Sequence, residues 1–278
     1  MKRNLVAIAA SLIAAVCAHS AEPPLPGADA TSAAAMRTTL APTGTLRAAF
    51  LGTNPVQGRV DPTTGTVTGP VADLIQELAK RLGVPYQLIP APDARAVIGH
   101  LQDKSADVGF LAYDASRAAV VDFAGPFANM LNSYVVANAS PLAASTGVDS
   151  TGLTIGAVKG QAQELFVSSH LQKARVRVFD RQPPQPEMEA LLRSGELSAF
   201  AMNRQRALEM DKASSELRAL PDSFLEVVQA FVVLKGEQRK RDVLDAFTAE
   251  LRSSGFVAKS LDKAGLRDST SVARAGIP

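Results

Sequence analysis

The stretch that decides the fold runs from Gly69 to Phe127 and reads GPVADLIQELAKRLGVPYQLIPAPDARAVIGHLQDKSADVGFLAYDASRAAVVDFAGPF. It begins with a predicted amphipathic helix, for which Pro70 suits the first turn and Gly83 suits the end. An extended apolar segment, a short helix and a buried strand at 107–112 follow. This strand runs into a polar loop with a single arginine, Arg117. Because a guanidinium is a planar, two-pronged donor, an arginine placed just after a buried strand is well suited to hold a carboxylate.

Alternating strands and helices continue beyond this stretch and fall into two units, with a change of character near Ser133. The strand patterns of the first unit lie at 46–51, 86–89 and 107–112, and those of the second unit lie at 154–158, 175–179 and 197–201. This alternation predicts an α/β fold of two mainly parallel sheets flanked by helices.

Two extended runs, at 135–138 and 227–234, are predicted to be hinge strands that cross between the units. Lobe 1 is then expected over 44–134, completed by 235–266, and lobe 2 over 139–226, with a tail at 267–278. A two-lobed body of this kind has a cleft near the C-terminal ends of its strands.

The first residues have the features of a secretory signal. Lys2 and Arg3 form a positive start, and the apolar run Leu5–Ala18 is short for a membrane span. Residues 1–20 are therefore predicted to be a cleavable signal peptide. The alternatives are an uncleaved anchor and a lipid anchor on Cys17. Residues 21–43, rich in Ala, Pro and Thr with no apolar period, are predicted to be a flexible leader.

Charge and cysteine content exclude several classes of function. Cleavage would remove Lys2 and Arg3 from the 29 basic residues, which leaves 27, equal to the number of acidic residues. A nearly neutral chain does not indicate a nucleic-acid partner. Cleavage would also remove Cys17, the single cysteine, and leave two histidines, His100 and His170. We therefore expect no disulfide, no metal site and no cofactor.

Five segments of the chain, in order and spacing, resemble those of the extracellular solute-binding proteins of family 3, the periplasmic receptors of polar amino acid ABC transporters. The segments are Gly44–Arg47, Thr68–Gly83, Arg117 with Phe123–Phe127, Gly160–Glu164 and Leu191–Ala199. The resemblance runs from about Gly44 to Leu266. It implies a two-lobed, periplasmic-binding-protein-like fold in which a small ligand is held between the lobes.

The resemblance also implies a set of ligand-binding residues. Arg117 stands where the family's arginine grips the ligand's carboxylate, and Gly160 to Gln163 stand at a helix start whose free N–H groups favour an anion. The alternatives are a structural Arg117, paired with Asp114 or Asp122, and a plain strand-to-helix turn at Gly160. The full predicted set is Leu51, Asn54, Leu111, Ala112, Tyr113, Asp114, Arg117, Gly160, Gln161, Ala162, Gln163 and Asn203.

The main departure from the family is Asn203, where its amino acid receptors commonly have an aspartate that holds the ligand's ammonium. Asparagine carries no charge, and a buried ammonium without a countercharge costs several kcal/mol. Either another acid, first of all Asp114, does this work, or the ligand is a carboxylate with no amine or a modified one. Leu111 and Ala112 in place of hydroxyl residues also predict a less polar cleft.

The expected function is therefore that of a monomeric periplasmic receptor, which captures a small carboxylate by hinge closure and delivers it to an ABC transporter permease in the inner membrane. Two alternatives stay open. One is a periplasmic enzyme similar to the cyclohexadienyl dehydratases of this fold, which needs a general acid in the cleft, and Asp114 is the candidate. The other is a receptor whose closed form signals to a membrane sensor.

Overall fold

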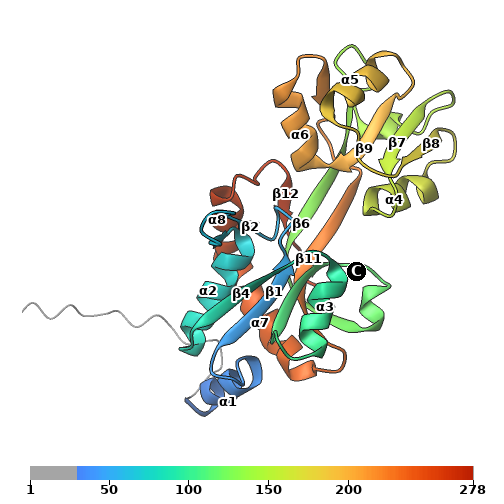
Figure 1. The fold of residues 1–278 in the computed structure, drawn as a ribbon. Helices are drawn as coiled ribbons and strands as arrows, with labels where there is room; N and C mark the ends of the chain where they lie inside the picture. Colours follow the sequence, from blue (N-terminus) through green and yellow to red (C-terminus); the bar gives the residue numbers. More distant parts are fainter. Residues whose placement is uncertain (1–29, 278) are drawn as a thin grey trace, which may run out of the picture.

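The computed structural model describes residues 30–277, with side chains described from residue 34. It shows two lobes joined by long crossing strands (Figure 1). The predicted signal peptide and residues 21–29 lie outside the described residues. Between residues 30 and 277, no helix is long and apolar enough to cross a membrane.

Each lobe combines parallel strands with flanking helices. Lobe 1 contains α1 (Ala30–Leu40), β1 (Leu46–Leu51), a hairpin of β2 (Arg59–Val60) and β3 (Val67–Thr68), α2 (Pro70–Leu82), β4 (Tyr86–Ala91), α3 (Ala94–Gln102), β5 (Val108–Ala112), the 3₁₀ turn η1 (Arg117–Ala119), α7 (Gln238–Ser253) and α8 (Phe256–Lys263). Lobe 2 contains η2 (Ser145–Gly147), β7 (Thr154–Val158), α4 (Ala162–His170), β8 (Arg175–Phe179), α5 (Gln185–Arg193), β9 (Ala199–Asn203), α6 (Arg204–Ala213) and β10 (Leu217–Ala219). The strands between the lobes are β6 (Val121–Ala137), β11 (Leu225–Leu234) and the short β12 (Thr270–Val272).

The strands form one hydrogen-bonded path in the order β4-β1-β5-β11-β6-β9-β7-β8. Within the lobes the predicted parallel pairing is confirmed, because β1 is parallel to β4 and β5, and β7 is parallel to β8 and β9. The two predicted strands that join the lobes are β6 and β11, which run antiparallel to each other and link the two parallel sets into one continuous sheet. The predicted crossing at 135–138 falls at the end of β6, a single strand of 17 residues.

The change of lobe along β6 lies slightly before the predicted crossing at 135–138. Residues 128–130 of β6 pair with β12, and residues 132–135 pair with β9 of lobe 2. Residues 229–232, within the predicted crossing 227–234, pair with β5 of lobe 1. The chain therefore passes between the lobes near residues 130–132 of β6 and 225–227 of β11. These two segments pair with each other.

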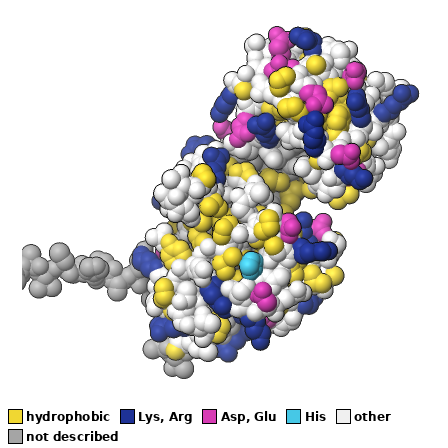
Figure 2. Space-filling model, viewed as in Figure 1, with side chains coloured by type: hydrophobic (Ala, Val, Ile, Leu, Met, Phe, Trp, Pro, Cys, Tyr) yellow, Lys and Arg dark blue, Asp and Glu magenta, His cyan; other side chains and the backbone are white. Residues whose placement is uncertain are grey.

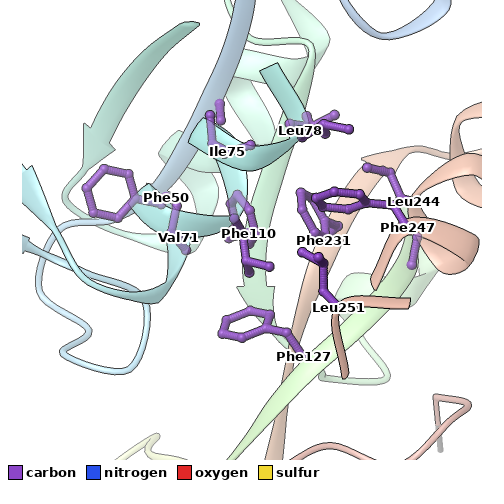
Figure 3. Close-up of a cluster of buried hydrophobic side chains, with 14 of the residues drawn as sticks. Phe50, Val71, Ile75, Leu78, Phe110, Phe127, Phe231, Leu244, Phe247 and Leu251 are labelled. Atoms are coloured by element: carbon purple, nitrogen blue, oxygen red, sulfur yellow. The ribbon is translucent and has the colours of Figure 1, made fainter. Parts of the chain in front are cut away.

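The core of lobe 1 follows from the helical spacing seen in the sequence. Pro70 occupies the first turn of α2, and Gly83 ends the helix in a left-handed conformation with its N–H donated to the carbonyls of Ala79 and Lys80. The buried face of α2 meets the strands and α7 around a group of phenylalanines, in which the centroids of the tilted Phe110 and Phe231 rings lie 4.2 Å apart (Figure 3). These contacts hold β5, and so the loop that carries Arg117, in a fixed place.

The predicted flexible leader is wrong for its second half, because residues 30–40 form α1 and the end of this helix is buried. Leu40 and Ala41 belong to the lobe 1 core, and Arg37 Nε donates to the Leu82 carbonyl at 2.9 Å. The run of alanines around position 34 has no apolar period, but alanine is the strongest helix former. Local propensity combined with packing on α2 therefore orders a segment that the hydrophobic pattern alone does not reveal.

Asp122 stabilises the turn between β11 and α7 through its carboxylate. This contact predicts that the stability of the fold decreases at acidic pH. The carboxylate accepts from Lys235 Nζ and from the Gly236 N–H, both at 2.8 Å. The Lys235 ammonium, and then the Gly236 N–H, lower the pKa of Asp122. The stabilisation is present above the unfolded pKa of about 3.9 and is lost as the pH falls through the lower folded value.

We expect Asp122→Asn to lower the free energy of urea unfolding at neutral pH. The variant should then lose less further stability than the unchanged protein when the pH falls below about 4. Asp180→Asn, at an exposed aspartate, is the matched control and should leave the pH dependence unchanged. Identical pH dependence in the Asp122 variant and the unchanged protein would contradict the assignment.

Candidate ligand-binding cleft

A cavity of about 670 Å³ lies between the lobes, at the C-terminal ends of their parallel strands. Figure 2 shows the molecule narrowed at this waist, with hydrophobic side chains gathered there. The cavity is lined by Thr53, Asn54, Pro55, Ala112, Tyr113, Asp114, Arg117, Met130, Gly160, Gln161, Ala162, Gln163, Leu165, Phe166, Ser169, Asn203, Leu225, Glu226, Val227 and Val228. Both lobes and both long strands therefore contribute to one site.

The structure brings together ten of the twelve predicted residues around this cavity. They are Asn54, Ala112, Tyr113, Asp114, Arg117, Gly160, Gln161, Ala162, Gln163 and Asn203. Leu111 is corrected, because its side chain is fully buried in the lobe 1 core on the α3 side of the sheet. Successive residues of β5 point to opposite faces, and both faces are covered. Leu51 is half-buried against the same core cluster and does not line the cavity.

Arg117 begins the short turn η1 that follows β5, on the lobe 1 wall. Its Nη1 donates to the Ala112 carbonyl at 2.8 Å, which fixes the guanidinium at the end of the strand. Among residues 34–277, no carboxylate lies at ion-pair distance from it. Of the two carboxylates named as alternative partners, Asp122 pairs with Lys235 instead, whereas Asp114 interacts with the charge of Arg117, which helps to lower the pKa of Asp114. The remaining N–H groups of Arg117 are available to a ligand.

Asp114 serves the loop that holds Arg117. Its Oδ1 accepts from the backbone N–H groups of Ser116, at 2.9 Å, and Arg117, at 3.3 Å, and also from the Ser116 hydroxyl. The hydroxyl contact is the main cause that lowers the pKa of Asp114, and the two N–H groups add to it. Asp114 is therefore ionised at neutral pH, and one of its oxygens is committed to its own turn.

The lobe 2 wall is the start of α4. Gly160 turns the chain from β7 towards the helix with a φ of +72°, and its N–H donates to Glu164 Oε2 at 3.1 Å. No side chain caps the first turn, so the N–H groups of Ala162 and Gln163 keep their donor capacity. Gln163 is buried and donates from Nε2 to Asn132 Oδ1 at 2.6 Å, which ties α4 to β6.

Asn203 ends β9 and caps α6. Its Oδ1 accepts from the Arg206 N–H at 2.8 Å, so the oxygen is used and the amide NH₂ remains for the cavity. The sequence showed the missing charge at this position. It did not show the cap, which uses one acceptor position of Oδ1 and fixes the orientation of the amide.

Sequence reasoning missed the floor and much of the apolar lining. The floor comes from Met130 of β6 and residues 225–228 of β11, which no local motif distinguishes from ordinary core strands. On α4, the cavity face follows the spacing Gln161, Leu165 and Ser169, four residues apart. That spacing was a usable signal, because residues four apart share one helix face.

Comparison with protein families decides what this architecture is. The model of the bacterial extracellular solute-binding proteins, family 3, matches residues 46–266, which is most of the chain.

The chain belongs to family 3 of the bacterial extracellular solute-binding proteins.

Solved structures agree with the family assignment at the level of the fold. An ancestral cationic amino acid solute-binding protein has a TM-score of 0.60 and 21% identity, with 82% of this chain and 98% of that chain covered. The amino acid ABC transporter substrate-binding protein AbpA of Streptococcus pneumoniae, bound to L-arginine, has a TM-score of 0.59 and 20% identity, with coverage of 83% and 98%. An ancestral cyclohexadienyl dehydratase has a TM-score of 0.54 and 22% identity, with coverage of 80% and 92%. No curated protein sequence matches the chain.

Proposed function

We propose that this family 3 protein is the periplasmic receptor of an ABC importer and captures a small carboxylate-bearing ligand between its lobes. The observation that carries the proposal is the pair of donor groups on opposite walls of one cavity. Arg117 lies on the lobe 1 wall, and the uncapped start of α4 lies on the lobe 2 wall. A guanidinium and the positive end of a helix dipole both favour an anion.

The two long strands supply the mechanism of capture. The lobes are connected through β6 and β11 near 130–132 and 225–227, and β12 pairs with β6 beside this point. A carboxylate bound first to Arg117 would draw the α4 wall towards lobe 1 by rotation about these strands. Closure would remove water from the site and strengthen both donor contacts. The closed form would be the one that docks on the membrane permease.

The proposal is tested with the mature protein, stripped of carried-over ligand by unfolding and refolding. We expect a panel of small carboxylates to contain ligands that raise the melting temperature and release heat in titration calorimetry. We also expect small-angle X-ray scattering to show a smaller radius of gyration on binding. A panel with no thermal shift and no heat, for a protein shown to be folded, would overturn the proposal.

The geometry gives less support to an enzyme of the dehydratase kind. A general acid in the cleft needs a carboxyl whose pKa is raised towards neutral pH, whereas the pKa of Asp114 is lowered. The other acidic residue on the cavity wall, Glu226, is exposed and bonded to Asn129. Incubation with prephenate or arogenate should therefore give no aromatic product.

A further inference from the structure

The groups on the cavity wall also indicate what kind of carboxylate fits. We infer that the ligand has no ammonium group and carries an apolar body, as in an aliphatic or aromatic 2-oxo acid or a simple branched or aryl carboxylate. This inference rests on the proposed function and concerns the specificity of the same site.

The carboxylates on the cavity wall determine whether a ligand ammonium could be neutralised. Among the described residues, two acidic side chains line the cavity, Asp114 and Glu226. Asp114 holds its own turn through three donors on Oδ1. Glu226 is exposed, and its Oε2 accepts from Asn129 Nδ2 at 2.8 Å. These contacts use one oxygen of each carboxylate. The charge of Asp114 is also balanced in part by Arg117, which helps to lower the pKa of Asp114, and Glu226 is open to water. A ligand ammonium enclosed in this cleft would lose its water without gaining a buried carboxylate reserved for it, which is unfavourable.

The amide oxygens on the cavity wall are the next best acceptors for an ammonium, and most of them already accept a hydrogen bond within the protein. Asn203 Oδ1 caps α6, and Asn54 Oδ1 accepts from the Val56 N–H at 3.0 Å. Gln163 is anchored through its Nε2, and its Oε1 is a single neutral acceptor. Arg117, the Asn203 amide and the N–H groups of α4 thus supply donors on both walls of the cavity. Donors match the oxygens of a carboxylate or a 2-oxo acid.

An apolar surface also faces the cavity. Leu165 is 55% exposed, the highest value among the large exposed hydrophobic side chains of the described chain, and it lines the cavity beside Phe166 on α4. Tyr113 of the lobe 1 wall and the floor residues Met130 and Val228 add to the apolar lining. An exposed leucine on a movable wall is covered only when the lobes close. An apolar ligand body between these walls would therefore add favourable burial at closure.

The experiment compares matched compounds that differ only at the amine carbon. One series is leucine, 4-methyl-2-oxopentanoate and 4-methylpentanoate, and the other is phenylalanine, phenylpyruvate and 3-phenylpropionate. We expect calorimetry to give the amine-free members a Kd lower by roughly 10- to 100-fold than the amino acids. Equal or tighter binding of the amino acids would overturn the inference and leave the receptor function standing. Absence of binding by every compound of both series, and by a general carboxylate panel, would overturn both.

Two variants test the groups that carry the argument. Asn203→Asp keeps a side chain that caps helices well and brings a carboxylate to the wall. It should weaken binding of the 2-oxo acids and strengthen binding of the amino acids, so that the preference moves by roughly tenfold or more. Leu165→Ser should weaken binding of the aryl and branched compounds more than binding of pyruvate, which has no large apolar body to contact this wall. If neither variant alters the preference in a protein that unfolds normally, the inference is wrong.

Discussion

Replacing Arg117 with alanine should weaken carboxylate binding by roughly 10- to 100-fold, because hydrogen bonds to a charged group each contribute about 1.5–3 kcal/mol. The guanidinium is held on the lobe 1 wall by the Ala112 carbonyl, and among the described residues it interacts with the charge of Asp114 without forming an ion pair at contact distance. Its charge is therefore available to the ligand, and its removal should cost little stability. Titration calorimetry measures the affinity, and urea unfolding measures the stability.

Two further variants make the test of Arg117 specific. Arg117→Lys keeps the positive charge but loses the planar two-pronged geometry, so its affinity should fall between those of the unchanged protein and the alanine variant. Arg181→Ala removes an arginine that is 74% exposed and lies outside the cavity, so it should bind normally. A normal Kd in the folded alanine variant would mean that Arg117 does not contact the ligand.

Much of the fold could be predicted because its signals are local. Pro70 and Gly83 bound a helix with one apolar face, and the strands that alternate with such helices pair in parallel, as β1, β4 and β5 do. The continuous β6 could not be predicted in this way. Its middle, with Gly125 and Pro126, contains residues typical of breaks in strands, and its partners β11 and β12 lie far along the chain. Pairing over such distances leaves no mark in a short window of sequence.

In the candidate site, too, the residues marked by a local signal could be predicted and the others could not. Arg117 could be predicted from its place in the loop after a buried strand, and the segment 160–163 from the resemblance to the family. Both lie beyond the C-terminal ends of parallel strands, where clefts of this kind form. The direction of Leu111 was not predictable, since β5 is apolar on both faces and the alternation carries no information. The role of Asn203 depends on the helix that follows it, because the cap uses the oxygen that an isolated asparagine would offer.

Gly125→Ala should cause a large loss of stability, because the backbone at this point has no room for a side chain. Gly125 lies where the register of β6 against β11 shifts, and its N–H donates to Asp245 Oδ1 at 2.5 Å. A Cβ added here would collide with the Thr248 hydroxyl and come within 2.7 Å of the Leu244 carbonyl oxygen, which belongs to the backbone of α7. The backbone also has a positive φ of +48° here, which strains any residue with a side chain. We therefore expect the substitution to lower the free energy of unfolding by about 2–4 kcal/mol.

Gly265→Ala separates the two causes of this loss. Gly265 also has a positive φ, of +72°, but a Cβ there would meet nothing within 4 Å. This control should lose only the cost of a left-handed conformation, about 1 kcal/mol. Urea unfolding of both variants measures the difference, which is the part due to the contact between β6 and α7. Equal losses in the two variants would show that α7 moves aside freely. In that case the packing of α7 against β6 would not fix the strand that leads from lobe 1 into the floor of the cleft.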